Sequence, residues 1–150
     1  MKIATEVAVL ATADKIWDTL MDFAAYPEWN RLVKAVRGQA APDTTLEVDI
    51  QYYGRPVERK TVTVTGFIPP KYFSWVWTHK LGAWFISAEH VYRIKELESG
   101  KVVFLQEIYY TGLGLRFRRR EAEQMLRLSV DKLNDDLKHR VEVEAGNPID

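Results

Sequence analysis

The residue best suited to acid–base chemistry is His90, which lies in a run whose side chains alternate between two faces. Ala88 and Tyr92 share its phase, so His90 is predicted to point toward the interior of a sheet. An imidazole with an ordinary pKa of about 6.5 could act there as a general acid or base. The alternative is a neutral core histidine that is hydrogen-bonded to a tyrosine. Glu89 points to the opposite face and cannot form a catalytic pair with His90.

A group of aromatic residues alternates in the same way in the preceding run. If residues 82–83 form a two-residue turn, Trp75 lies opposite His90. Trp77 then lies opposite Ala88. The candidate ligand-binding residues on this face are Phe73, Trp75, Trp77, His79, His90 and Tyr92. Buried Trp and Tyr need partners for their polar atoms, and a solid core would more naturally use Leu, Ile and Val. The pattern therefore favours the wall of a pocket for an apolar or aromatic molecule, and a core filled by the rings themselves is the alternative.

Other kinds of site find little support. The chain has no cysteine, which excludes disulfides, thiolate zinc sites and a cysteine nucleophile. Only His79 and His90 could converge, and no histidine spacing typical of a metal site is present, so we predict no metal. The glycine-rich phosphate-binding motifs and the serine nucleophile motif are also missing from the sequence. We therefore expect no cofactor.

The composition is that of an ordinary globular protein of 150 residues, with 47% hydrophobic and 28% charged residues. Its 21 basic and 21 acidic residues balance, which argues against nucleic-acid binding because that needs a basic surface. No apolar run approaches the roughly 18 residues needed to span a bilayer. Glu6 stands where a signal peptide would need its apolar region, so a cytoplasmic protein is predicted. No linker divides the chain, and residues 1–150 are expected to form a single domain.

The elements that would position these side chains follow from the hydrophobic periodicity. Residues 2–11 are predicted to form a strand, and Thr12 is predicted to cap a short helix that carries Ile16, Leu20 and Phe23 on one face. Pro27 indicates one further helical turn or a tight corner. From residue 33 to residue 111 the period changes to two, which predicts antiparallel strands. The facing of residues 102–110 is ambiguous because that run is almost continuously apolar.

The last predicted element is a long helix over residues 116–142, a stretch without Gly or Pro. Apolar residues recur along it at spacings of three and four. They are Ala122, Leu126, Val130, Leu133, Leu137 and Val141. Ion pairs at i,i+4 spacing are predicted on its solvent side between Arg127 and Asp131 and between Asp136 and Arg140. A single antiparallel sheet must cover its apolar face, and only this helix is long enough to do so. We therefore predict an α+β fold in which a curved antiparallel sheet of about seven strands wraps around the C-terminal helix.

Three local patterns strengthen this prediction: residues 23–30 (FAAYPEWN), residues 89–92 (EHVY) and residues 133–142 (LNDDLKHRVE). Together with the order of elements, they resemble the helix-grip fold of the START-like (SRPBCC) superfamily, in its polyketide cyclase/dehydrase and lipid-transport branch. Arg31 departs from the family pattern, which usually has proline after Trp-Asn. Ile108 stands where the family often has glutamate, and the acid Glu107 lies one place away, so no catalytic role is carried over.

The resemblance implies that the chain binds a small hydrophobic or aromatic molecule, such as a lipid, polyketide or steroid, between the sheet and the C-terminal helix. Leu126, Glu107 and Tyr109 join the candidate ligand-binding residues. The alternative is a polyketide cyclase or dehydratase that uses His90 as acid or base, with Glu107, Tyr109 or Tyr110 as helpers. A further alternative is a non-catalytic interaction module with a filled core. The sequence leaves the ligand open, and also whether the chain is a monomer or a homodimer.

One charge run stands out: Arg116, Arg118, Arg119 and Arg120. Arginine at the start of a helix is unfavourable for the helix dipole, which suggests weak contact with an anionic membrane. A solvated first helical turn with neighbouring glutamates is the alternative. The apolar residues and glycines of 112–115, just before this run, are predicted to form a lid over the cavity.

Overall fold

The computed structural model describes residues 1–81, 84–112 and 118–146. Seven strands, two α-helices, a 3₁₀ turn and one further helical turn make up this part of the chain. In order they are β1 (Lys2–Val9), α1 (Ala13–Met21), η1 (Phe23–Ala25), α2 (Tyr26–Trp29), β2 (Val33–Arg37), β3 (Thr45–Ile50), β4 (Glu58–Ile68), β5 (Tyr72–Leu81), β6 (Trp84–Glu96), β7 (Val102–Gly112) and α3 (Arg119–Glu144).

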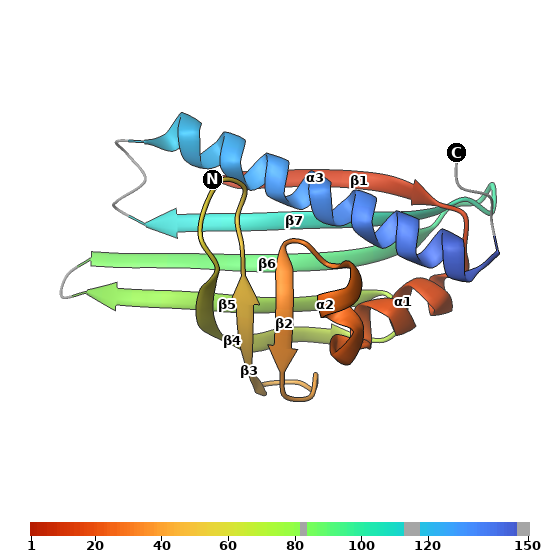
Figure 1. Ribbon diagram of the computed structural model, residues 1–150, viewed down its shortest axis with the longest axis horizontal. Coiled ribbons are helices and arrows are strands. Elements are labelled where there is room, and N and C mark those ends of the chain that lie inside the picture. Colours follow the sequence, from red (N-terminus) through yellow and green to blue (C-terminus); the bar gives the residue numbers. More distant parts are fainter. Residues whose placement is uncertain (82–83, 113–117, 147–150) are drawn as a thin grey trace.

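The strands form one antiparallel sheet in the order β1-β7-β6-β5-β4-β3-β2. Each strand pairs with its neighbour in sequence except β1, which closes on β7 near the end of the chain. Figure 1 shows α3 crossing the strands of this sheet, with α1 and α2 beside its C-terminal half. The predicted helix-grip architecture is confirmed. We call the sheet face that is covered by α3 the inner face and the opposite one the outer face.

The first helix begins as predicted. The Thr12 hydroxyl accepts a hydrogen bond from the Lys15 backbone N–H at 3.2 Å, which satisfies one of the free donors of the first turn. Pro27 sits in the first turn of α2, where its missing N–H costs nothing. Both short helices therefore follow from local sequence.

Strand β7 resolves the ambiguity over residues 102–110. Phe104, Gln106 and Ile108 lie on the inner face and are almost completely buried. Val103 and Glu107 are also buried although they face outward. Both faces of the strand are therefore covered along much of its length, which explains why no alternation was visible in the sequence.

The long helix α3 carries the predicted apolar stripe, and Leu126, Val130, Leu133, Leu137 and Val141 are buried in the core. Its ion pairs differ from the prediction. Arg127 pairs with Glu123 instead of Asp131, at 3.8 Å. Asp136 and Arg140 do not pair with each other either. Asp136 instead accepts bonds from Arg31, just after α2, and Arg140 reaches Glu28 on α2 and Glu144 at the end of α3 itself.

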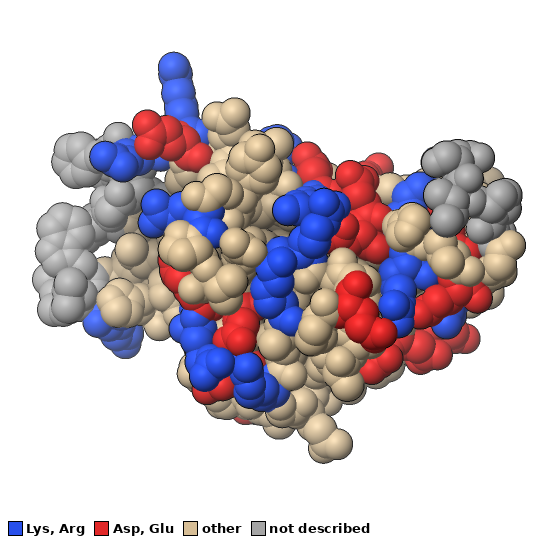
Figure 2. Space-filling view, viewed as in Figure 1, with Lys and Arg blue, Asp and Glu red and all other residues tan. Residues whose placement is uncertain are grey.

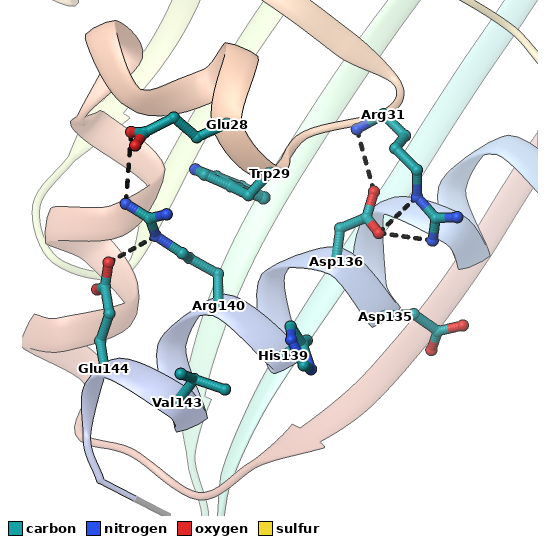
Figure 3. Close-up of a pocket in the computed structure, with 9 residues that line it drawn as sticks. All are labelled: Glu28, Trp29, Arg31, Asp135, Asp136, His139, Arg140, Val143 and Glu144. Atoms are coloured by element: carbon teal, nitrogen blue, oxygen red, sulfur yellow. Dashed lines mark hydrogen bonds and ion pairs between the residues drawn. The ribbon is translucent and has the colours of Figure 1, made fainter. Parts of the chain in front are cut away.

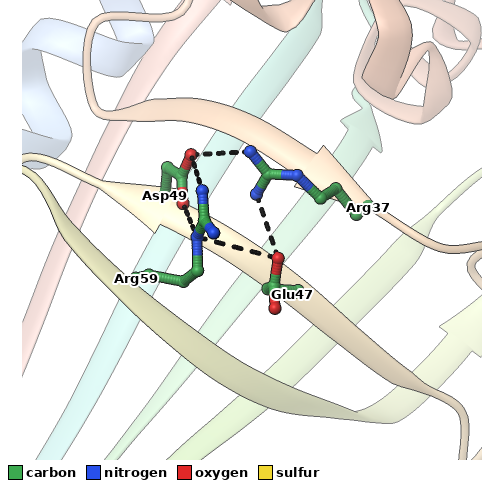
Figure 4. Close-up of polar contacts among 4 residues, drawn as sticks. All are labelled: Arg37, Glu47, Asp49 and Arg59. Carbon is green, nitrogen blue, oxygen red and sulfur yellow. Dashed lines mark hydrogen bonds and ion pairs between the residues drawn. The ribbon is translucent and has the colours of Figure 1, made fainter.

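A cluster of charged residues connects β2, β3 and β4 on the outer face of the sheet (Figure 4). Asp49 on β3 accepts hydrogen bonds from Arg37 on β2 and from Arg59 on β4, each at 2.9 Å, and Glu47 lies 3.3 Å from Arg37. The bonds from Arg37 and Arg59 hold the pKa of Asp49 well below its usual range. These pairs of opposite charge between neighbouring strands stabilise the pairing of the strands at this edge of the sheet.

The surface around α3 carries interspersed acidic and basic side chains (Figure 2), as expected from a net charge of zero. None of the helices in the described part of the chain combines the length and the apolar character that a bilayer crossing requires.

Candidate functional site

The inner face of the sheet carries a wall of aromatic rings whose register agrees with the prediction. Trp75 pairs with His90 across β5 and β6, and Trp77 pairs with Ala88. The wall is solid at its centre: Phe73 stacks on Tyr92 with ring centroids 5.9 Å apart, and Trp75 meets Phe73 edge to face at 5.3 Å. Trp75 is only 3% exposed. These central rings pack as a core, and edge-to-face and offset contacts of this kind are favourable in themselves.

His90 lies within this core at 5% exposure and has a hydrogen-bond partner for each ring nitrogen. Its Nε2 lies 2.9 Å from Gln106 Oε1, and its Nδ1 lies 3.1 Å from the Tyr92 hydroxyl. The Gln106 amide nitrogen donates to the Val130 carbonyl at 3.0 Å and to Asn134 Oδ1 at 2.5 Å. The amide nitrogen is thus fully used, so Gln106 Oε1 accepts from His90.

This network assigns the proton on the imidazole. Because Gln106 accepts, His90 Nε2 is the donor and Nδ1 is the acceptor, and the Tyr92 hydroxyl donates to it. Burial lowers the pKa of His90 to about 4, with the Gln106 bond acting in the opposite direction. His90 is therefore neutral at neutral pH. Burial also raises the pKa of Tyr92 well above its usual range, which keeps this hydroxyl a donor.

The network continues from the core to the surface through α3 and β1. Asn134 donates to the Thr5 hydroxyl at 3.3 Å, and Thr5 in turn donates to the exposed Asp131 carboxylate at 2.5 Å. Gln106 and Asn134 were not among the predicted site residues. Two features of the sequence could have indicated them. Gln106 is a polar residue in phase with Phe104 and Ile108, and Asn134 is a polar residue directly after Leu133 of the apolar stripe.

Toward one end of the inner face, which we call the open end, the described residues bury two side chains of one row only in part. Trp77, Ala88 and Tyr110 stand opposite one another across β5, β6 and β7. Trp77 and Tyr110 pack against the core while keeping part of their surface accessible, as does Met125 on α3. Figure 1 shows that the first turns of α3 lie at this end of the sheet. Ala88 has the smallest side chain of the row and is itself buried, at 9% exposure.

His79 and Leu126, two further predicted residues, flank this end in different ways. His79 is exposed and stacks on Trp77 with ring centroids 6.0 Å apart and planes 10° apart. Leu126 is buried on α3 within the same core cluster as the aromatic wall. Both therefore lie on the inner side of the molecule.

Lys60 is a charged residue at the open end that was not among the predicted site residues. It shares the inner phase of β4 with the buried Val62 and Val64, and its side chain is only 11% exposed. Its Nζ lies 3.5 Å from the centroid of the Trp77 ring and 3.1 Å from Glu58 Oε2. The signal in the sequence was the phase: a lysine at the position where alternation requires an inward side chain.

Glu107 and Tyr109 lie on the outer face, and the structure does not bring them together with His90. Ile108 is the residue that stands opposite His90, so its two neighbours point the other way. Glu107 pairs with Lys2 and with Arg93, each at 2.9 Å, and these bonds keep its pKa low against the effect of burial. Tyr109 is half-exposed beneath the Lys2 ammonium.

A separate groove of about 660 Å³ lies outside the fold core, between α2 and the C-terminal half of α3 (Figure 3). Trp29 and Val143 are its apolar lining residues, and its other lining residues are charged or histidine. Arg31 and Arg140 are both held by carboxylates at its edges. Arg31, the residue that departs from the family pattern, thus anchors the start of β2 to Asp136.

The described residues cover only part of the arginine run and of the lid that were predicted at the start of α3. Arg118 is the N-cap of α3, and Arg118, Arg119 and Arg120 are exposed. Arg116 and nearly all of the predicted lid over 112–115 lie outside the described residues. Within the described ranges, no group of three or more His, Asp or Glu side chains is arranged to hold a metal ion.

Comparison with known proteins agrees with this architecture. The family model described as "Polyketide cyclase / dehydrase and lipid transport" matches residues 1–142. No curated protein sequence matches the chain.

Solved structures with low sequence identity share the fold. A START superfamily protein from Mycobacterium smegmatis is 20% identical with a TM-score of 0.74, over 95% of this chain and 98% of that one. A conserved protein from Geobacillus kaustophilus is 13% identical with a TM-score of 0.73, over 96% and 97%. The di-domain ARO/CYC BexL from the BE-7585A biosynthetic pathway is 13% identical with a TM-score of 0.64, over 99% of this chain and 51% of that one.

Proposed function

Because this chain belongs to the polyketide cyclase/dehydrase and lipid transport family, we propose that it binds one small hydrophobic or aromatic molecule between the inner face of the sheet and α3. The observation that carries the proposal is the gradient of burial along the aromatic wall. Trp75 and His90 are closed off from solvent, whereas Trp77 and Tyr110, one row further along, are not. The ligand enters at this open end and lies over Ala88, with the central rings as the floor.

The chemistry of this end suits such a ligand. Pockets for small molecules are mostly apolar and aromatic, with a few polar groups that orient the ligand. Trp77, Tyr110 and Met125 supply apolar surface, and the hydroxyl of Tyr110 and the ammonium of Lys60 supply polar contacts.

A substitution that fills the space tests the proposal. Ala88→Leu places three extra carbons between Trp77 and Tyr110, and Ala4→Leu makes the same change at an exposed position on the outer face. Titration with the uncharged dye N-phenyl-1-naphthylamine is expected to show saturable one-to-one binding to the wild type. Ala88→Leu is expected to lose about tenfold or more in affinity through overpacking, and Ala4→Leu none. Absence of binding by the wild type, or equal binding by Ala88→Leu, would refute the proposal.

Catalysis is the second candidate, and the Tyr92–His90–Gln106 network favours it over a purely apolar floor. The network holds His90 neutral, with Nδ1 facing the Tyr92 hydroxyl. The lone pair of the neutral imidazole, on Nδ1, accepts from Tyr92. A proton removed from a polyketide-like substrate to begin a cyclisation or dehydration would therefore pass to the Tyr92 oxygen as the Tyr92 proton moves to His90. His90→Ala is then expected to lower turnover of a poly-β-ketone substrate about 100-fold. Unchanged turnover removes His90 from the mechanism.

The exposed arginines at the start of α3 lie at the same end of the sheet as the opening. We extend the proposal to weak contact between Arg118, Arg119, Arg120 and anionic lipid, which would bring the opening to a membrane that holds a lipid ligand. Sedimentation with phosphatidylserine vesicles at low salt is expected to capture the wild type, and to capture the triple alanine variant less. A wild type that stays in solution would end this extension.

A further inference from the structure

Lys60 occupies an unusual place for a lysine. Its position on β4 directs it to the inner face, and only 11% of its side chain is accessible. Lysine is rarely buried to this degree without a partner, since removing an ammonium from water is costly. The aliphatic stem of such a residue normally leads the charge out to solvent, yet here the charge lies over the ring of Trp77.

The groups that compensate this charge do not use all of its hydrogen-bond donors. The Trp77 ring centroid is 3.5 Å from Nζ, and that of Tyr52 is 6.0 Å away, which are cation–π distances. Among the described residues, Glu58 is the one carboxylate in contact, at 3.1 Å. An ammonium group has three protons to donate. Glu58 is 44% exposed, so it can turn into solvent at little cost.

The ammonium also lies where the proposed ligand enters, because Trp77 belongs both to its aromatic surround and to the open row of the sheet. Tyr52 lies in the same surround, and besides burial the charge of Glu58 raises the pKa of both Tyr52 and Tyr110. Burial raises the pKa of each hydroxyl, so both remain neutral donors. The Lys60 ammonium thus lies between the rings of Tyr52 and Trp77, and Trp77 shares its row of the sheet with Tyr110.

We propose that the ligand is a hydrophobic acid, whose terminal oxyanion binds the Lys60 ammonium in place of Glu58 while its apolar body lies over Ala88. This inference rests on the proposed function, and it adds the chemical class of the ligand. A charge-assisted hydrogen bond is stronger than a neutral one and is directional, so it would both select acids and orient them with the apolar end inward.

Two dyes that differ by one sulfonate test the charge directly. 8-Anilino-1-naphthalenesulfonate is an anion, and N-phenyl-1-naphthylamine has the same ring system without the charge. Both are titrated into the wild type, Lys60→Gln, Lys60→Arg and the control Lys80→Gln. The control Lys80→Gln removes an equal charge near the same end of the sheet. Lys80 is exposed and lies on the outer face of β5. Circular dichroism and urea unfolding establish that each variant is folded.

The wild type is expected to bind the anionic dye more tightly than the neutral one. Lys60→Gln is expected to lower the affinity for the anionic dye about tenfold, the scale of one hydrogen bond to a charged group. Its affinity for the neutral dye is expected to change less than twofold. Lys60→Arg and Lys80→Gln retain wild-type affinity for the anion, and decanoate displaces the dye more effectively than decanol. The acid assignment is overturned if Lys60→Gln weakens the binding of both dyes equally. It is also overturned if Lys80→Gln and Lys60→Gln weaken the binding of the anionic dye equally. Either result leaves the proposed ligand binding intact. Binding of neither dye by the wild type overturns both proposals.

Discussion

Protonation of His90 is expected to destabilise this protein between pH 7 and pH 5, a range in which its carboxylates contribute little. The imidazole is buried and neutral, with its Nδ1 accepting from Tyr92 and its Nε2 donating to Gln106. The folded state holds the pKa of His90 at about 4, against an ordinary value of 6.5 in the unfolded chain. Below pH 6.5 the unfolded chain therefore binds more protons than the folded one, and the free energy of unfolding falls as the pH falls.

The size of the effect follows from this difference in pKa. Each unit corresponds to about 1.4 kcal/mol, so the loss is about 2 kcal/mol between pH 7 and pH 5, and it approaches about 3 kcal/mol at pH 4. The carboxylates of Glu107 and Glu142 have lowered pKa values, so their contribution is present above the ordinary value of 4.5 and is lost only below it. The interval from pH 5 to pH 7 therefore isolates the histidine.

Urea unfolding at pH 7, 6 and 5, at constant ionic strength, measures this effect. His90→Gln cannot take up a proton, so the wild type is expected to lose about 2 kcal/mol more than this variant between pH 7 and pH 5. The control His79→Gln, at an exposed position, is expected to follow the wild type. Parallel pH profiles for the wild type and His90→Gln would show that the imidazole binds protons equally in both states, and would refute the assignment of a neutral, buried His90.

Other substitutions test the network, the aromatic wall and a tight contact in β4. Asn134→Ala leaves the Gln106 amide short of an acceptor in the core and is expected to cost about 2 kcal/mol of unfolding free energy in urea melts; a cost near zero would contradict the network. Trp75→Ala is expected to cost about 3–5 kcal/mol because the ring is fully packed, and Trp77→Ala clearly less; equal costs would contradict the gradient of burial. Gly66→Ala would place a Cβ 2.2 Å from a ring carbon of Tyr72 and is expected to lower the thermal midpoint through a loss of about 1–3 kcal/mol, with an unchanged midpoint as the contrary result.

Much of the fold was predictable because it depends on interactions that are close in sequence. The Thr12 cap and the position of Pro27 are satisfied within one helical turn. The alternation of apolar residues identifies which strand residues face inward, and the helical stripe with Leu126 identifies the buried side of α3. The pairing of Trp75 with His90, predicted by assuming a two-residue turn, is the one that β5 and β6 adopt, because turn length sets the register of an antiparallel hairpin.

The residues around His90 could not be predicted in the same way. Gln106 reaches His90 diagonally from the neighbouring strand β7, and Asn134 meets Gln106 only because α3 crosses the sheet at that point. Glu107 was expected beside the ligand, but the register of β7 against β6 turns it to the outer face. The partners of the α3 charges also depend on where α2 lies against the helix, as Arg31 shows.

The sequence alone therefore determined which elements form and, for α3 and the strands that alternate, which face is buried, since both follow from spacing along the chain. Tertiary structure decided which buried side chains meet, and that in turn decided the protonation of His90 and the inward placement of the Lys60 charge. The physical reason is one of range: secondary structure reflects contacts within a few residues, whereas a site depends on how separate strands and a helix are aligned in space, which no local pattern encodes.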